Sequence, residues 1–270
     1  MKKAQLAINS VSTGGADLNE RLSAYTEAGF QNVEFQLGQV WAEIERGRSA
    51  EDIRRALEGY GLRCIGGFET DLAVFGETEA NHARILKNAE LLGVLGGTTL
   101  VVGVGGWPGE RPADPVGDAA SVAGELAERM ATFGVRLAIE FNWSPWVKSL
   151  RTAVDIARRS ESPQVGVLFD PAHYHCTPSK FDQLDEEAVR HLFHVHVDDM
   201  RDKPGELSDC NSDRELPGEG ILPLQEIFGR IEALGYDGYF SIEMFSERLW
   251  SLPAAEAAKR MYASLLSLCD

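Results

Sequence analysis

One structural unit repeats along this chain: an amphipathic helical segment, a glycine, an apolar run and a polar loop. ATFG leads into VRLAIE in this way, and EALGYDG leads into YFSIE. A glycine just past a helix suits the left-handed residue that ends it, and a short turn then starts the next strand. The pattern predicts eight strands, which begin near Gln5, Asn32, Leu62, Thr98, Val135, Gln164, Leu192 and Gly238.

Eight helical segments alternate with these strands. We expect helices over Leu18–Ala28, Ala50–Gly59, Glu79–Leu92, Val116–Phe133, Leu150–Arg159, Asp182–Arg190, Leu222–Ala233 and Pro253–Leu268. Strict alternation of this kind favours a (β/α)8 TIM barrel of the α/β class, with an open doubly wound sheet as the alternative. The first strand is not followed by GxGxxG, and no GxxxxGK[ST] occurs. No linker divides the chain, so we predict one domain over residues 1–270.

Composition narrows the class of protein. The formal net charge of −16 argues against nucleic acid and anionic membranes as partners. No apolar stretch is long enough to span a bilayer, and the N-terminus is a poor signal peptide. The 4 cysteines are scattered, which indicates free thiols in a reducing compartment. We therefore expect a cytoplasmic protein with a small-molecule partner, and homo-oligomerisation stays open.

Four apolar runs in the second half carry possible metal ligands at or near their ends. VRLAIE ends at Glu140, QVGVLFD at Asp170 and GYFSIE at Glu243, while LFHVHVDD contains His196. A carboxylate at the dry end of a strand is costly unless its charge is compensated. A single such glutamate could pair with an arginine, but four groups together point to one shared metal ion. Three carboxylates and one imidazole suit Mn²⁺ or Mg²⁺ and also accept Co²⁺ or Zn²⁺.

Three further residues near these strand ends are candidates either for a supporting role at the site or for a purely structural one. His173, in the segment DPAHYHC, follows the sixth strand and is a candidate ligand, substrate donor or plain loop residue. By the two-residue period of a strand, His194 and Asp198 share a face with His196. We expect His194 to be a hydrogen-bonded core histidine one layer below, and Asp198 to orient the His196 imidazole.

The remaining candidates lie in predicted loops or strand ends at the same face. Glu34 ends the second strand and is a candidate substrate contact, and Trp107 and Trp143 fall in loops that could form a wall against a sugar ring. Arg214 lies in the polar stretch 198–220, whose length predicts either a lid or a disordered segment.

These motifs resemble a known family. The order Glu140, then Asp170-Pro-Ala-His173, then His196, then Glu243 is similar to that of the xylose isomerase-like barrels called sugar phosphate isomerases/epimerases. Within them, FDPAHYH, HVHVDD, DRELPGEG and SIEMFSERLW most resemble inosose (2-keto-myo-inositol) isomerases. The resemblance covers nearly the whole chain but is loose before about Val135.

The resemblance implies one divalent metal ion bound by Glu140, Asp170, His196 and Glu243. Glu140 and Glu243 would also move protons as the catalytic acid/base pair, and His173 and Arg214 would contact substrate oxygens. We expect isomerisation or epimerisation of a keto-sugar or keto-inositol, by proton transfer through a metal-stabilised enediolate.

Three alternatives stay beside this one. The first is a lyase that dehydrates a dehydroshikimate- or inosose-type substrate, and the second is a non-catalytic sugar-binding barrel. The third is a DNA-repair endonuclease with several zinc ions. That class carries an Asp-x-His pair after the seventh strand. This chain reads SDRELPGEG there and has no histidine, which argues against the endonuclease.

Overall fold

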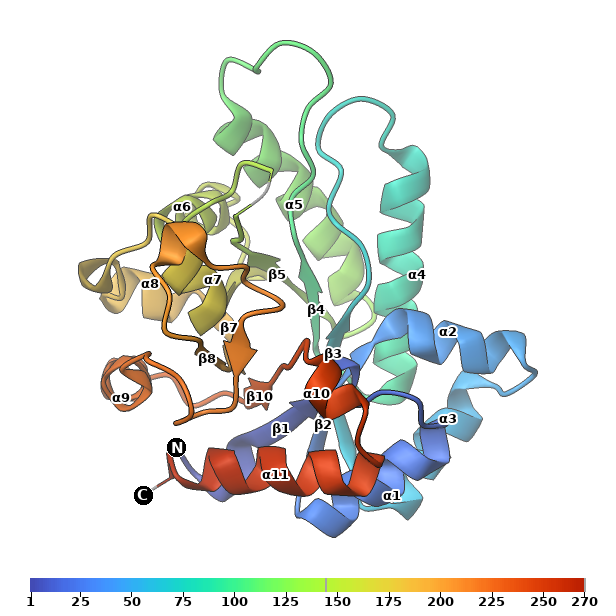
Figure 1. The fold of residues 1–270 in the computed structure, drawn as a ribbon. Helices are drawn as coiled ribbons and strands as arrows, with labels where there is room; N and C mark the ends of the chain where they lie inside the picture. Colours follow the sequence, from blue (N-terminus) through green and yellow to red (C-terminus); the bar gives the residue numbers. More distant parts are fainter. Residues whose placement is uncertain (144, 270) are drawn as a thin grey trace.

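The computed structural model describes residues 1–143 and 145–269, and within them eight parallel strands close into a barrel (Figure 1). Their order around the barrel is β1-β10-β7-β6-β5-β4-β3-β2. Closure is made where β1 pairs with β10, with Leu6 opposite Phe240. The strands are β1 (Leu6–Asn9), β2 (Asn32–Gln36), β3 (Arg63–Phe68), β4 (Thr99–Val102), β5 (Arg136–Glu140), β6 (Val165–Phe169), β7 (Leu192–Val197) and β10 (Phe240–Ile242). The predicted (β/α)8 barrel is confirmed, and an open sheet is excluded.

Helices surround the barrel in Figure 1. They are α1 (Leu18–Ala28), α2 (Leu37–Glu45), α3 (Ala50–Gly59), α4 (Glu79–Leu95), α5 (Pro115–Ala131), α6 (Leu150–Arg159), α7 (Pro171–Cys176), α8 (Glu186–Arg190), α9 (Leu224–Ala233), α10 (Glu247–Trp250) and α11 (Ala254–Leu266). The prediction for Asp182–Arg190 resolves into a 3-10 turn over Phe181–Gln183 followed by α8. The sequence pattern missed α2, α7 and α10. None of the helices in the described part of the chain is long and apolar enough to cross a membrane.

Side-chain caps and glycines set the ends of the helices. The Ser49 hydroxyl accepts a hydrogen bond from the backbone nitrogen of Asp52, and the Asp52 carboxylate accepts one from the backbone nitrogen of Ser49; this capping box starts α3. Asp114 caps α5 with proline at its first turn. Gly29 and Gly96 end α1 and α4 at φ 110° and 87°, a region that glycine enters without steric cost. The repeated glycines of the sequence therefore act as predicted.

The two-residue period of the strands divides the core into two layers. On β5, Leu137 and Ile139 pack outward against the helices, whereas Ala138 faces the barrel interior with Val101 and Leu168. The same period puts Glu140 on the interior side, one layer above Ala138. This small apolar cluster in the barrel interior therefore lies one layer below the polar residues at the strand ends.

The polar stretch 198–220 is an ordered hairpin, neither a disordered segment nor a plain loop. Its strands β8 (Asp199–Met200) and β9 (Arg214–Glu215) pair antiparallel. The buried Asp199 carboxylate organises this segment, because it accepts hydrogen bonds from the backbone nitrogens of Met200, Gly218, Gly220 and Leu222. The hairpin thereby fixes the position of Arg214.

We predict that position 66 tolerates only glycine, because β3 and β4 approach each other closely there. A Cβ on Gly66 would lie 2.5 Å from the Thr99 carbonyl oxygen, so Gly66→Ala should lower the free energy of unfolding by about 1–3 kcal/mol. Gly229→Ala on α9 is the matched control, because its Cβ meets nothing within 4 Å and should stabilise by about 0.5–1 kcal/mol. Urea unfolding of both variants checks this. Equal stabilities would contradict it.

Candidate active site

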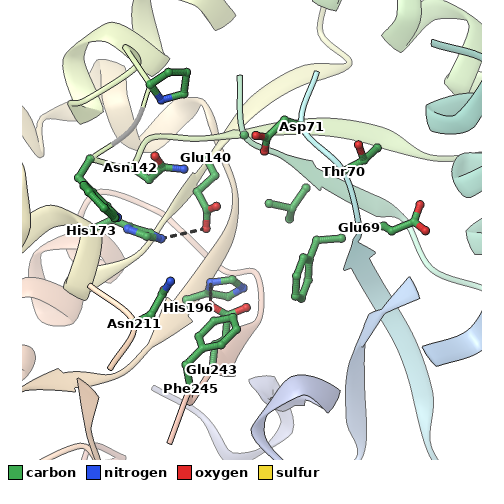
Figure 2. A pocket seen from close by; sticks show the side chains of 15 residues that line it. Glu69, Thr70, Asp71, Glu140, Asn142, His173, His196, Asn211, Glu243 and Phe245 are labelled. Atoms are coloured by element: carbon green, nitrogen blue, oxygen red, sulfur yellow. Dashed lines mark ion pairs between the residues drawn. The ribbon is translucent and has the colours of Figure 1, made fainter. Parts of the chain in front are cut away.

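The carboxyl ends of the strands surround a cavity of about 410 Å³ (Figure 2). Glu140, His173, His196 and Glu243 line it, together with residues from the β3 and β5 loops. The residues that carry the four predicted metal ligands follow or end β5, β6, β7 and β10, which are consecutive in the barrel. Their side chains therefore meet although they are far apart in sequence.

Donor atoms from Glu140, Asp170 and His196 all lie within 4.8 Å of one another. His196 Nδ1 is 3.3 Å from Asp170 Oδ2 and 3.4 Å from Glu243 Oε2. The set combines hard carboxylate oxygens with one imidazole nitrogen, which fits a divalent ion such as Mn²⁺ or Zn²⁺. The cluster contains three of the four predicted ligands, and ligation by the whole set, with Glu243 as the fourth member, stays a prediction.

Asp170 is held rigidly because it also starts α7. Its Oδ1 accepts a hydrogen bond from the backbone nitrogen of His173 at 2.9 Å, and Pro171 occupies the first helical position. Its Oδ2 points the other way, toward His196 and the Arg214 guanidinium. One oxygen thus caps a helix while the other faces the site.

The Arg214 side chain is fully buried among carboxylates at the strand ends. Its guanidinium lies 3.0 Å from Asp170 Oδ2, 2.8 Å from Asp198 Oδ2 and 2.9 Å from Glu243 Oε2. It is absent from the described residues that line the cavity, so the predicted contact with substrate oxygens is not seen in this arrangement. The alternative of a glutamate paired with an arginine therefore holds in part for Glu243.

Asp198 does not orient the His196 imidazole, and that prediction is corrected. Its Oδ1 accepts a hydrogen bond from the backbone nitrogen of Ala172, and its Oδ2 pairs with Arg214. The chain turns into the β8–β9 hairpin directly after β7, and this turn takes Asp198 toward α7. The strand period fails at this residue because the strand has already ended at Val197.

Glu243 is fixed on both oxygens. Asn9, at the end of β1, donates to Oε1 at 2.9 Å, and Arg214 donates to Oε2. Burial raises the pKa of Glu243 to about 7, while the charges of His196 and Arg214 oppose the shift. A carboxyl group with such a pKa can both release and accept a proton near neutral pH.

His173 faces Glu140 across the upper part of the cavity. Its Nε2 lies 3.5 Å from Glu140 Oε1, the ion pair drawn in Figure 2. Burial alone would lower the pKa of His173, but the charges of Asp170 and Glu140 raise it well above its usual range. A histidine in this position can donate a hydrogen bond into the cavity.

Glu34 is placed differently from the substrate contact that we predicted. It is 0 % exposed and is not among the residues that line the cavity. Its Oε2 lies 3.0 Å from His194 Nε2 and 3.1 Å from His196 Nε2. His194 is, as expected, a buried histidine one layer below His196.

The two predicted wall tryptophans have different surroundings. Trp143 lines the cavity and is 54 % exposed. Trp107 lies outside the lining, where its ring packs on Phe75 at 5.9 Å and on Trp146 at 5.6 Å. In this arrangement Trp107 supports the loop behind the wall and does not form the wall itself.

Several lining residues were missed by the sequence analysis. They are Glu69, Asp71, Asn142, Asn211 and Phe245, among others. Asn142 and Phe245 each stand two residues beyond a predicted ligand, so extending the strand period would have found them. Asn211 lies in the β8–β9 connection, where no periodic signal exists. Glu69 is tied up by Arg84 and Asn88, whose side chains donate to its carboxylate.

Residues 22–267 match the model of the family described as xylose isomerase-like TIM barrel. This chain belongs to that family. It is 32 % identical to an inosose isomerase of Halalkalibacterium halodurans over 142 residues, 52 % of this chain and 50 % of that protein. It is 27 % identical to a 3-dehydroshikimate dehydratase of Pseudomonas aeruginosa over 273 residues, 98 % of this chain and 42 % of that protein. The aligned part spans about half the length of these relatives or less.

A solved structure shows the same fold. The crystal structure of the IOLI protein with a bound zinc atom superimposes with a TM-score of 0.85 at 21 % identity, and the match covers 98 % of this chain and 97 % of that one. The family expected from the motifs is confirmed.

We predict that Arg214 is the main compensator of the buried carboxylates. Arg214→Gln should lower the free energy of unfolding of the metal-free protein by about 3–5 kcal/mol, because it leaves carboxylates buried without their cation. Arg201→Gln, in the same hairpin, is the control: the Arg201 side chain is 53 % exposed, and its ion pairs should contribute about 1 kcal/mol or less. Chemical unfolding of both variants measures the difference. Similar losses would contradict the prediction.

Proposed function

We propose that this protein is a divalent-metal-dependent isomerase or epimerase of an uncharged keto-sugar or keto-inositol. The observation that carries the proposal is the pair Glu140 and Glu243, which enter one cavity from β5 and from the end of β10. Between them in the barrel stand β6 and β7, which deliver Asp170 and His196. Two carboxylates on either side of a ligand set form an arrangement suited to moving protons.

Glu140, Asp170, His196 and Glu243 would hold the metal. When bound, the ion would withdraw electron density from a substrate carbonyl and so acidify the neighbouring C–H bond. The family resemblance and the fit of the donor set support this assignment.

The protein side of the reaction is proton transfer at two carboxylates. One glutamate removes the proton from the substrate carbon, and the other returns a proton, either to the opposite face of that carbon or to the adjacent carbon. In the second case the proton of the neighbouring hydroxyl also passes to the former carbonyl oxygen, so that carbonyl and hydroxyl exchange places. Glu243 is suited to either role because Asn9 and Arg214 fix its orientation. His173 would donate a hydrogen bond to a substrate oxygen close to Glu140.

The cavity wall favours an uncharged substrate. Of the described residues that line it, none is lysine or arginine, whereas Asp71, Glu140 and Glu243 are acidic. A phosphate or carboxylate on the substrate would find no unpaired cation in this wall, while hydroxyl groups would find acceptors. Trp143 and Phe245 add apolar surface against the ring of a sugar or cyclitol.

The second candidate is a dehydratase, which the similarity to a 3-dehydroshikimate dehydratase supports. It would begin with the same proton abstraction and continue with loss of a β-hydroxyl group. The acidic wall favours an inosose-type substrate for such a reaction over an anionic one. A sugar-binding barrel without catalysis would not need two carboxylates facing one ligand.

Proton exchange tests the acid/base pair directly. Metal-loaded protein in deuterated water should exchange a carbon-bound proton of a keto-inositol or ketose, followed by proton NMR. Glu140→Gln and Glu243→Gln should each slow exchange by at least about a hundredfold. Glu90→Gln on the exposed face of α4 should leave it unchanged. Removing the metal with a chelator should stop exchange and adding it back should restore it; full exchange by either site variant would refute the assigned roles.

A substrate panel tests the charge of the wall. We expect an uncharged keto-inositol or ketose to react with a kcat/KM at least about tenfold above that of a ketose phosphate or 3-dehydroshikimate, because the wall repels anions. Asp71→Asn should narrow this gap. Appearance of an ultraviolet-absorbing conjugated product would establish the dehydratase, and preference for 3-dehydroshikimate would refute the uncharged substrate.

A further inference from the structure

Glu34 is a buried carboxylate that the proposed reaction does not use. It lies in the middle of β2, is 0 % exposed and is not among the residues that line the cavity. Burying such a charge costs several kcal/mol unless partners compensate it. The groups at its oxygens are the imidazoles of His194 and His196. Because burying it is costly and it lies beside the predicted metal ligand His196, the Glu34 carboxylate is a candidate for a role in the site.

The His196 ring stands between two sets of carboxylates. On its lower edge, Nε2 lies 3.1 Å from Glu34 Oε2 and 3.2 Å from Oε1. On its upper edge, Nδ1 faces Asp170 Oδ2 at 3.3 Å and Glu243 Oε2 at 3.4 Å. Nε2 of the ring therefore faces Glu34, and Nδ1 faces the carboxylates of the predicted metal site.

We propose that Glu34 is a positioning residue that accepts the Nε2–H of His196 and so presents the Nδ1 lone pair to the metal. An imidazole that donates one N–H to a carboxylate keeps one tautomer and one orientation, and its other nitrogen becomes a better ligand. The inference rests on the metal site assigned in the proposed function, but it does not require any particular reaction.

His194 fixes Glu34 in this position from the side. Its Nε2 lies 3.0 Å from the same Oε2, and its ring meets the His196 ring edge-on, with centroids 5.4 Å apart at 82°. Glu34, His194 and His196 come from β2 and β7, which lie on different parts of the barrel. The triangle thus spans the barrel interior below the cavity.

A competing interpretation is a second metal site. Glu34, His194 and His196 also offer donor atoms within 4.8 Å of one another. An ion there would take the Nε2 nitrogen that our proposal leaves protonated. The two interpretations therefore differ in the number of ions bound and in the proton on Nε2.

Titration calorimetry with Zn²⁺ tests the positioning role. Glu34→Leu removes the acceptor and should weaken zinc binding by roughly 10–100-fold, whereas Glu34→Gln keeps an acceptor oxygen and should lose less. Glu43→Leu is the control, because it removes a half-buried carboxylate on α2 that pairs with Arg46 and Arg48 outside the cavity. Its zinc affinity should stay close to that of the wild type. Unchanged affinity of Glu34→Leu would overturn the proposal.

If Glu34→Leu does not fold, nitrogen-15 NMR of the zinc-loaded wild type tests the same proposal. We expect one zinc per chain, a hydrogen-bonded proton on His196 Nε2 and a metal-bound Nδ1. Zinc on Nε2, or two zinc ions per chain, would overturn the proposal. None of these measurements depends on turnover, so loss of the proposed isomerase activity would leave this result standing.

Discussion

The structure of the site depends on compensating negative charge that the barrel has buried. Asp170, Asp198 and Glu243 surround one guanidinium, that of Arg214, whose side chain is fully buried. Arg214 does not come from the barrel itself but from the β8–β9 hairpin. That hairpin is held by Asp199, which collects four backbone N–H groups. The β8–β9 hairpin, which follows the seventh barrel strand, therefore supplies part of the charge compensation of the site.

The order of strands around the barrel then decides which side chains meet. Glu140, Asp170, His196 and Glu243 are separated by between 26 and 47 positions from one to the next, yet β5, β6, β7 and β10 are neighbours. Parallel strands end at the same face, so residues at their ends share one depth. The wall toward β3 and β4 is built differently, from the strand residues Phe68 and Val101 and from loop residues such as Asp71.

Much of this was predictable from sequence because it follows from periodicity. The strand ends, the helices and the convergence of Glu140, His196 and Glu243 all follow from alternation and closure. The short helix α7 was missed although its signal was present, since Asp170-Pro171 is a capping residue followed by proline at the first turn. The helix α2 begins directly after β2, and the last strand residue, Gln36, is also the N-cap of the helix, so no loop marks its start.

What could not be predicted depends on contacts between segments distant in the sequence. Glu34 and His194 occupy ordinary interior positions of their strands, and only barrel closure brings them together. Asp198 lies two residues after His196, so the strand period would place both on the same face. The strand ends at Val197, however, and the period no longer applies at Asp198. The partners of Arg214 depend on the fold of the β8–β9 hairpin, which contains no periodic run. Periodicity thus predicts the depth and face of a side chain, but not its partner.

The balance between stability and function follows from this charge arrangement. Arg214 supplies one positive charge, which cannot neutralise Glu34, Asp170, Asp198 and Glu243 together. Protonation supplies the rest: burial raises the pKa of Asp198 well above its usual range and that of Glu243 to about 7, and the imidazoles contribute as well. Burial alone would lower the pKa of His196, yet the charges of Glu243 and Glu34 raise it well above its usual range. A divalent ion bound at the proposed site would supply more charge at the same place and would displace a proton from the imidazole. The buried negative charge that costs the fold stability would therefore also attract the ion.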